Sequence, residues 1–388
     1  MKQWGKVSIM LLAVALMVVL SACGNKTNES TNSGSNAANQ TGDNATNQTG
    51  EANQANEAGT TNDSKDLDAL KGKKIALIMQ FNTGTFSSQY IQGVKDQAAK
   101  FGGEVQVFAS DNDLAKMSSN LDAAVNQGFD GILIDHGQAG ALEAGIKKAL
   151  EQNIQVVVFD ADIKIPGVTV LQQDDQKMSE MTLNKMSEDI GGKGSIVKVW
   201  VAGFAPMERR EVAYKAFMES NPDIKQISAF GNANNPAMDA QSQMEAVLKK
   251  FPNKGDITAV WAAWDEFAKG ASRAIQQAGR TEIKVYGIDM SDEDLQMIQD
   301  TASPWVASAA VDPISIGSVQ VRYLYQKFNG DQTDETVVLT PSMVKREDLP
   351  ALPEKVSTSQ LSQYVEGWGS NDQGYTDTLK ELEASAAK

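Results

Sequence analysis

The sequence predicts an α/β protein whose folded part consists of two doubly wound parallel-sheet lobes. From residue 75 onward, short apolar runs alternate with stretches of helical periodicity, which is the pattern of strands joined by crossover helices. The alternation pauses near Val168–Leu171 and resumes in a second set of similar size. The chain then returns late, with one more strand pattern at 337–341. We therefore expect two lobes with a cleft between them.

The first set opens with a buried-strand pattern at 75–79. A polar turn at 80–88, which holds Phe81 and Phe86, precedes a helical stretch that ends at Gly102 and Gly103, because glycine is typical of helix C-termini. The same criteria predict strands at 105–109, 131–134 and 154–159 and helices at 90–101, 114–127 and 141–152.

The second set centres on the segment 257–290. An apolar strand pattern at 257–261 is followed by a helical pattern that stops at Gly279, and a second strand pattern at 283–288 ends abruptly in Asp289. Around this segment we expect helices at 178–190, 208–220, 240–251 and 314–328 and strands at 195–201, 224–230 and 305–310. The tail 342–388 is less regular and has one short helical pattern at 376–386.

The amino terminus has the composition of an export signal. Lys2 and Lys6 precede the apolar run 7–19, which is followed by Leu20-Ser21-Ala22-Cys23, and the apolar core is short for a membrane span. One interpretation is a cleaved signal with an incidental cysteine. The other is a lipoprotein signal at 1–22, because the four residues resemble a lipobox; that resemblance implies lipidation of Cys23 and a location on the extracytoplasmic face of the cell membrane.

Residues 23–66 are predicted to form a disordered tether. From Gly24 to about Ser64 the segment consists mainly of Asn, Thr, Gly, Ser, Gln and Ala and contains no aromatic residue, so it has too little apolar surface to offset its ordering entropy. A flexible coil of about 40 residues spans roughly 35 Å root-mean-square.

Composition excludes several classes of function. The net charge is −15, which argues against nucleic acid or anionic lipid as a partner, since both require a basic surface. The chain has one Cys and one His, so we expect neither a zinc or copper site nor a disulfide framework. We predict no cofactor.

No motif indicates catalysis. The segment after the first strand pattern is QFNTGTFSS, where a dinucleotide-binding fold would carry G-x-G-x-x-G. The glycine-rich stretch 191–195 lacks the spacing of a phosphate loop, and we interpret it as a turn. The neighbouring pairs Asp160/Asp162 and Asp265/Glu266 are poor acid–base pairs, because adjacent residues at a strand end rarely face one ligand. We therefore predict that the protein is not an enzyme.

Polar and aromatic side chains gather at the ends of predicted strands: Phe86, Asp160, Trp264 and Asp289. In an open parallel sheet these ends border the crevice where ligands bind. Carboxylates accept hydroxyl hydrogen bonds and aromatic faces stack on sugar rings. His136 is expected to have a turn or surface role, and either Arg209 or Arg210 could point into the cleft or into solvent.

From about Lys73 to Val344 the chain resembles the type I periplasmic binding proteins of the ribose-binding class. Six blocks carry the resemblance in the family's order: KKIALIM with the following loop and helix, VVVFDAD, ERREVAYKAF, AVWAAWDEFAKGASRAI, VYGIDM and VDPISIG. The resemblance implies two lobes joined by a three-crossing hinge, with crossings near 171–174, 310–312 and 339–341. It divides the chain into an N-terminal lobe, 67–173 plus 312–340, and a C-terminal lobe with tail, 174–311 plus 341–388.

The family's ligand residues carry over unevenly. Phe86, Asp160, Arg210 and Asp289 fit positions that contact ligand in the family. Trp264 takes a position usually held by Asn beside the motif's Asp265.

Other positions depart from the family pattern. Val311 stands where the family has glutamine, Ser87 where it has a second aromatic residue, and Asn235 lies near another aromatic position. Gln80, Asn82 and Asn234 could supply replacement hydrogen bonds. The resemblance therefore implies a monosaccharide other than ribose, or a polyol or another small polar molecule.

By resemblance, the protein captures this solute outside the cell as a monomer and delivers it to an ABC permease. A module that presents the ligand to a membrane receptor or histidine kinase has the same sequence features, so it stays open as an alternative. An enzyme acting on a small carbohydrate fits the motifs less well.

Overall fold

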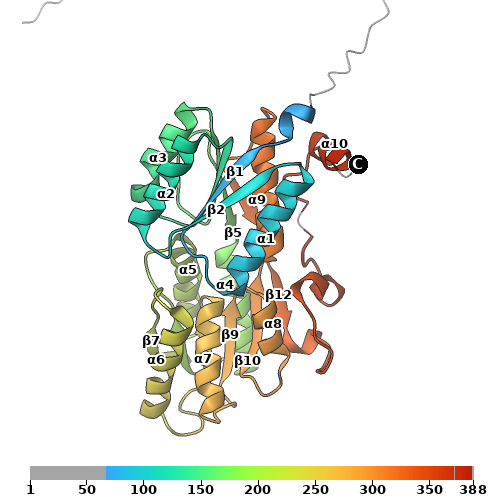
Figure 1. The fold of residues 1–388 in the computed structure, drawn as a ribbon. Coiled ribbons are helices and arrows are strands. Elements are labelled where there is room, and N and C mark those ends of the chain that lie inside the picture. Colours follow the sequence, from blue (N-terminus) through green and yellow to red (C-terminus); the bar gives the residue numbers. More distant parts are fainter. Residues whose placement is uncertain (1–66, 371, 387–388) are drawn as a thin grey trace, which may run out of the picture. The chain divides into compact units, whose positions relative to one another are not determined.

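The computed structural model describes residues 67–370 and 372–386 (Figure 1). The predicted signal, Cys23 and the tether lie outside the described residues. Within the described part the chain forms two six-stranded sheets, with strand orders β11-β5-β4-β3-β1-β2 and β12-β10-β9-β8-β6-β7. The predicted fold class, two doubly wound and mainly parallel lobes, is confirmed.

The first sheet is parallel throughout and has helices on both faces. Leu77 faces a core built with α1 and α9, whereas the next residue, Ile78, faces a second core built with α2 and α3. Both faces are therefore covered, which explains the continuous apolar strand patterns. The elements are β1 (Lys74–Met79), α1 (Gly84–Lys100), β2 (Glu104–Ala109), α2 (Leu114–Gln127), β3 (Gly131–Asp135), α3 (Ala139–Glu151), β4 (Gln155–Phe159), β5 (Thr169–Gln173), α9 (Pro313–Phe328) and β11 (Thr336–Leu339), after the short η1 (Leu67–Leu70).

The second sheet is parallel except for β12, which pairs antiparallel with β10. Its core includes Trp261, whose indole donates to Thr182 of α4 (3.0 Å) and stacks on Tyr214 of α5. The elements are α4 (Asp175–Asp189), β6 (Gly194–Val199), α5 (Ala205–Ser220), β7 (Ile224–Phe230), α6 (Pro236–Lys250), β8 (Ala259–Ala262), α7 (Asp265–Gln277), β9 (Lys284–Ile288), α8 (Asp292–Gln299), β10 (Trp305–Ala310) and β12 (Ser342–Lys345).

The chain passes between the two sheets three times, after β5, after β10 and after β11. These passages fall at 173–175, 310–313 and 339–342, close to the positions expected from the resemblance. The carboxyl ends of the parallel strands in both sheets therefore meet between the lobes.

Several helices begin earlier than the sequence indicated. The predicted turn 80–88 is too long, since α1 starts at Gly84 and places Phe86 in its first turn. Likewise α5 starts at Ala205 and α6 at Pro236. A single first turn is too short to show the repeating apolar stripe that reveals a helix in sequence.

The tail divides between the lobes. Val356, Leu361, Val365 and Trp368 belong to the core of the second lobe, around η3 (Thr358–Gln363). Leu379 and Leu382 of α10 (Asp377–Ala386) belong instead to the core of the first lobe, against α9 and η1. The assignment of the whole stretch 341–388 to the second lobe therefore needs correction from residue 372 onward.

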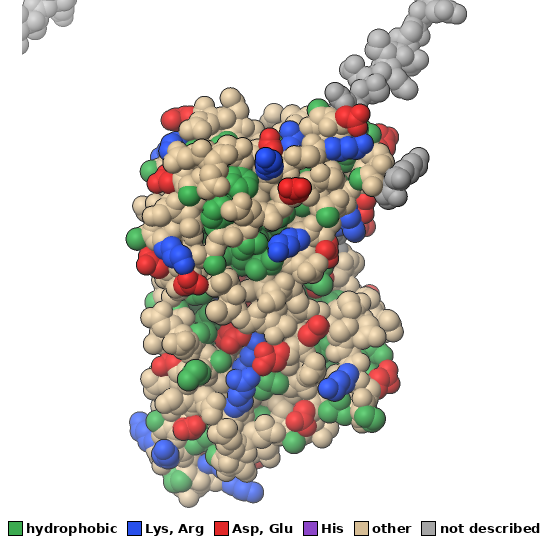
Figure 2. All heavy atoms as spheres, in the orientation of Figure 1, with side chains coloured by type: hydrophobic (Ala, Val, Ile, Leu, Met, Phe, Trp, Pro, Cys, Tyr) green, Lys and Arg blue, Asp and Glu red, His purple; other side chains and the backbone are tan. Residues whose placement is uncertain are grey.

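Figure 2 shows acidic and basic side chains interspersed over one face, although the chain as a whole carries a net charge of −15. On the face shown, the described side chains form no continuous basic surface of the kind that nucleic acid requires. No helix among residues 67–370 and 372–386 is long and apolar enough to span a membrane.

Candidate functional site

A pocket lies between the lobes and is lined by both of them. Its space, including the part open to solvent, is about 650 Å³. The first lobe contributes Met79, Phe81, Phe86, Ser87, Tyr90, Asp135, His136, Phe159 and Gln173, and the second lobe contributes Val201, Phe204, Pro206, Met207, Arg210, Trp264 and Asp289.

A buried polar group formed by Arg210, Asp289 and Gln173 makes one part of the wall. Arg210 donates to both carboxylate oxygens of Asp289, at 3.1 and 3.2 Å, the two-pronged geometry that suits a guanidinium. Its other donors reach the Asp175 carboxylate (2.8 Å) and the Ala263 carbonyl (2.6 Å). Gln173 Nε2 donates to Asp289 Oδ1 across the lobes at 3.3 Å. Gln173 Oε1 is buried and has no hydrogen-bond partner among the described residues.

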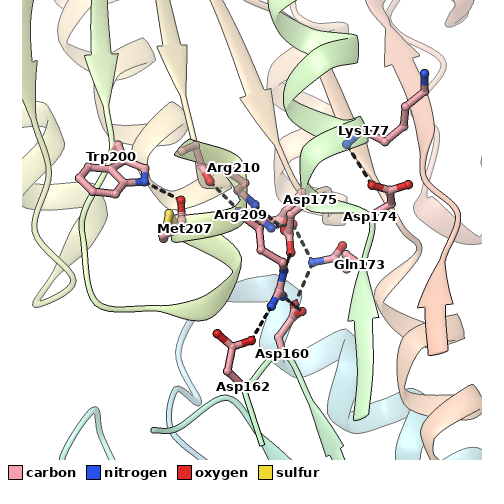
Figure 3. A network of polar contacts seen from close by, with 12 residues as sticks. Asp160, Asp162, Gln173, Asp174, Asp175, Lys177, Trp200, Met207, Arg209 and Arg210 are labelled. Atoms are coloured by element: carbon pink, nitrogen blue, oxygen red, sulfur yellow. Dashed lines mark hydrogen bonds and ion pairs between the residues drawn. The ribbon is translucent and has the colours of Figure 1, made fainter. Parts of the chain in front are cut away.

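Arg209 connects the lobes beside this polar group. It extends from α5 of the second lobe to Asp160 (2.7 Å) and Asp162 (3.3 Å), which follow β4 of the first lobe. It also pairs with Asp175 at 2.7 Å. Figure 3 shows Arg209 among these three carboxylates, with Arg210 beside it. Both arginines therefore point inward. From the sequence alone, either of them could have pointed into the cleft or into solvent.

Burial raises the pKa of Asp160, Asp175 and Asp289, although the neighbouring arginines oppose the shift, and that of Asp175 rises to about 6. Burial by itself would lower the pKa of Arg210, but Asp289, Asp175 and Asp160 more than reverse this effect. Three buried carboxylates, Asp160, Asp175 and Asp289, thus share two guanidinium groups, and the exposed Asp162 also pairs with Arg209. The described residues include no group of three or more Asp, Glu, His and Cys side chains that could hold a metal ion.

Aromatic rings form another part of the wall. Phe81 of the first lobe lies 5.6 Å, between ring centroids, from both Phe204 and Trp264 of the second lobe. Tyr90 and Phe159 stack deeper in the first lobe with centroids 5.6 Å apart. Rings at these separations interact favourably and offer flat apolar faces to a ligand.

His136 lies in the pocket wall, although the sequence favoured a turn or surface role. Its Nδ1 is 3.0 Å from the Asp135 carboxylate, and its ring contacts Phe81 and Phe159 edge-on. Burial lowers the pKa of His136, but Asp135 and Asp160 more than compensate, so the net pKa is raised.

Three strand ends at the site have left-handed backbone. His136, Asp160 and Asp289, which follow β3, β4 and β9, have φ values of 58°, 52° and 75°. Such conformations cost about 1–3 kcal/mol for residues other than glycine, are best tolerated by Asn, Asp and His, and cluster at functional sites. Three of the seven non-glycine residues with positive φ in the described part of the chain thus lie at strand ends that border the pocket.

The structure brings four of the six principal predicted residues to this pocket: Phe86, Arg210, Trp264 and Asp289. Asp160 is not in the wall, because Arg209 and Gln173 engage its carboxylate.

Asn235, the sixth principal residue, and Asn82 lie in a neighbouring cavity that shares Phe81 and Trp264 with the pocket. That cavity is also lined by Asn112 and Asn234, whose amides meet across the lobes at 3.0 Å.

Three secondary candidates, Gln80, Asp265 and Val311, are not in the pocket wall. The prediction that they contact the ligand is therefore corrected. Gln80 is buried and supports neighbouring loops by bonding Asn112 (2.9 Å) and the Gly137 amide (2.8 Å). Asp265 begins α7 and pairs with buried Lys269 at 3.4 Å. Val311 is a buried residue of the first-lobe core.

Sequence reasoning missed Phe81, Tyr90, Gln173 and Phe204. Gln173 ends β5 and was accessible to the strand-end argument, but the strand was not recognised beyond Leu171. Phe204 precedes α5, whose start was placed at 208. The predicted turn 80–88 contains both Phe81 and Phe86, and its sequence does not indicate that Phe81 also lines the pocket.

Comparison with known proteins gives one family and a consistent set of relatives. Residues 75–332 match the family model described as a periplasmic binding protein domain. A xylitol-binding protein of Mycolicibacterium smegmatis is 26% identical over 222 residues, and the match covers 56% of this chain and 62% of that protein. A ribose import binding protein of Bacillus subtilis is 25% identical over 250 residues, covering 63% and 78%.

Two crystal structures are similar over most of the chain. A sugar ABC transporter protein of Yersinia enterocolitica has a TM-score of 0.78 and 36% identity, covering 82% of this chain and 98% of that one. A 5-methylthioribose transporter solute binding protein of Thermotoga lettingae, in complex with 5-methylthioribose, has a TM-score of 0.76 and 31% identity, covering 80% and 98%.

Proposed function

Because this chain belongs to the family of periplasmic binding protein domains, we propose that it is the solute-binding component of an ABC importer. It captures a small sugar or polyol in the pocket between its lobes and presents it to the permease. Besides the xylitol-binding protein and the ribose import binding protein, a D-apiose import binding protein of Actinobacillus succinogenes is similar to this chain. The chemistry that these three ligands share is a small polyhydroxylated molecule. These relatives are transport proteins.

The observation that carries the proposal is the pocket with partners from both lobes. Gln173 of the first lobe and Arg210 and Asp289 of the second lie in one wall. Gln173 Oε1 is a buried acceptor with no partner within residues 67–370 and 372–386, and an unmet buried acceptor costs about 1–3 kcal/mol. This cost arises only while the second lobe is in contact and buries the oxygen. A ligand hydroxyl that donates to Gln173 Oε1 removes the cost in that arrangement. Ligand binding therefore favours the closed arrangement.

We further propose that the protein is attached to the membrane and acts as a monomer. The signal-like segment 1–22 and the lipobox around Cys23 support attachment to the membrane by acyl chains, each methylene contributing about 0.8 kcal/mol. The protein then acts as a monomer on the extracytoplasmic face of the membrane, held by the segment 23–66.

A binding panel tests the function directly. The full chain is titrated calorimetrically with D-ribose, xylitol, D-apiose, allitol and 5-methylthio-D-ribose, and we expect saturable binding of at least one. Asp289→Asn keeps the side-chain volume but loses the charge that Arg210 pairs with, and it should weaken that binding at least tenfold.

A surface carboxylate serves as the matched control. Glu143 on α3 forms an exposed ion pair with Lys147, so Glu143→Gln should bind like the wild type. Absence of binding to every sugar and polyol of the panel would contradict the proposed function. Unchanged affinity in Asp289→Asn would contradict the location of the site.

A further inference from the structure

We propose that the ligand is a sugar or polyol carrying an apolar substituent, and that this substituent lies against Phe81, Phe204 and Trp264. The inference rests on the proposed function and names the chemical class of its ligand. Three features of the pocket support it: the order of side chains along the two sheet edges, the number of hydrogen-bonding groups still available, and the composition of the wall.

The polar and aromatic groups follow different strands of each sheet. In the first sheet Gln173 ends β5, whereas Phe81 follows β1, three strand positions away in the order β5-β4-β3-β1. Neighbouring strands are about 4.8 Å apart, so the two backbone positions are separated by roughly 14 Å.

The second sheet repeats this order. Asp289 follows β9, Trp264 follows β8 and Phe204 lies beyond β6, in the strand order β9-β8-β6. Gln173 therefore lies on the side of Asp289, and Phe81 on the side of Trp264 and Phe204. Phe159, Asp135 and His136, at the ends of β4 and β3, lie between Gln173 and Phe81 in the wall. The contact between Phe81 and both Phe204 and Trp264 across the lobes agrees with this arrangement.

The polar end has a small remaining capacity for hydrogen bonds. A guanidinium has five N–H donors, and Arg210 already uses four of them on Asp175, Ala263 and Asp289. Both Nε2 donors of Gln173 are used on Asp160 and Asp289. What remains is one Arg210 N–H, Gln173 Oε1 and a free lone pair of Asp289, which suits a few hydroxyls on one side of a ligand.

The wall as a whole is mainly apolar. Ten of its sixteen residues are Met, Phe, Tyr, Val, Pro or Trp. At the aromatic end, Phe81 and Phe204 have no hydrogen-bonding side-chain atom, and Trp264 has only its indole N–H. A hydroxyl that lies against these three rings would lose its water and gain no acceptor from them, which disfavours binding. Of the polar wall residues, His136 contacts Phe81 edge-on, and its Nδ1 is already paired with Asp135. An alkyl or thioether group loses nothing and gains roughly fourfold in affinity for each buried methylene.

The test compares two sugars that differ in the group on C5, which is a hydroxyl in one and a methylthio group in the other. D-Ribose and 5-methylthio-D-ribose are titrated calorimetrically into the full chain. We expect the thioether sugar to bind at least tenfold more tightly, since it replaces a poorly accommodated hydroxyl with an apolar group.

Variants locate the origin of the preference. Phe204→Ala removes one ring of the aromatic end and should reduce the affinity ratio of the two sugars to threefold or less. Phe230 packs at the edge of the second-lobe core and is not in the pocket wall, so Phe230→Ala should keep the ratio of the wild type. Asp289→Asn should weaken both sugars by a similar factor.

The outcomes separate the two proposals. If ribose binds as tightly as 5-methylthio-D-ribose, the proposed function stands and the apolar substituent is refuted. If the ratio survives in Phe204→Ala, the substituent does not lie against the proposed rings, which also overturns the inference. If neither these sugars nor the polyols of the panel bind, the proposed function itself fails.

Discussion

Arg209 is expected to control how firmly the lobes hold a bound ligand. Its guanidinium leaves the second lobe to reach Asp160 and Asp162 of the first lobe at 2.7 and 3.3 Å, while its bond to Asp175 stays within its own lobe. Arg209→Ala therefore removes an ion pair that exists only when the lobes are together. The open arrangement loses only the contact with Asp175.

The size of the effect follows from burial. The side chain of Asp160 is 1% exposed and that of Arg209 is 19% exposed. Removing one partner of a fully buried pair costs about 3–5 kcal/mol. Since Gln173 still donates to Asp160 and Arg209 is partly solvated, we expect about 1–2 kcal/mol, which raises the Kd by roughly 5- to 30-fold.

Calorimetry with the tightest-binding sugar of the panel measures this change. A double-mutant cycle with Asp160→Asn isolates the pair, because the second substitution should add little once Arg209 is gone. Arg273→Ala is the control, as Arg273 forms an exposed ion pair with Glu293 within the second lobe. An Arg209→Ala protein that binds within twofold of the wild type would refute the reasoning.

Three further predictions concern the pocket, its titration and the amino terminus. Trp264→Ala should weaken sugar binding by about 1–3 kcal/mol, measured calorimetrically, with a smaller loss of melting temperature than Phe217→Ala in the core; the reverse pattern would make Trp264 a core residue. Burial raises the pKa of Asp175 to about 6, so the folded chain keeps a proton between about pH 4 and 6 that the unfolded chain loses. The melting temperature of the wild type relative to Asp175→Asn should therefore fall across this interval and level off above it; a constant difference would count against the shift. Cys23→Ser should move the protein from the membrane to the soluble fraction on immunoblots, and continued membrane attachment would contradict lipidation.

The repeating cores of the fold could be predicted from sequence, whereas the edges could not. The bounds of α2, β7 and β10 agree with the apolar patterns that predicted them. By contrast α1 begins six residues before the predicted start, and β12 was not recognised. A helix is visible in sequence only where an apolar stripe repeats, and the first turn of α1 holds a single large apolar residue, Phe86. The starts of helices near the site were thus among the least predictable parts of the fold.

The candidate site shows the same division. Strand-end reasoning found Trp264 and Asp289 because an abrupt change from apolar to polar marks the sheet edge. It could not distinguish a strand-end residue that lines the pocket from one that forms a salt bridge. The difference depends on whether a side chain of the other lobe reaches that residue. Asp160 illustrates this, because its carboxylate is engaged by Arg209 from the other lobe. Pairings between residues 49 positions apart in the chain leave no local signal.

Gln173 shows why the missing residues matter to the mechanism. It ends β5 at the first chain crossing and donates to Asp160 of its own lobe and to Asp289 of the other. The same amide presents its unpartnered oxygen at the pocket. A ligand hydroxyl that binds this oxygen fixes the amide in the orientation that also joins the lobes. Gln173 therefore takes part both in the candidate site and in one of the contacts between the lobes, so affinity and closure should change together when it is altered.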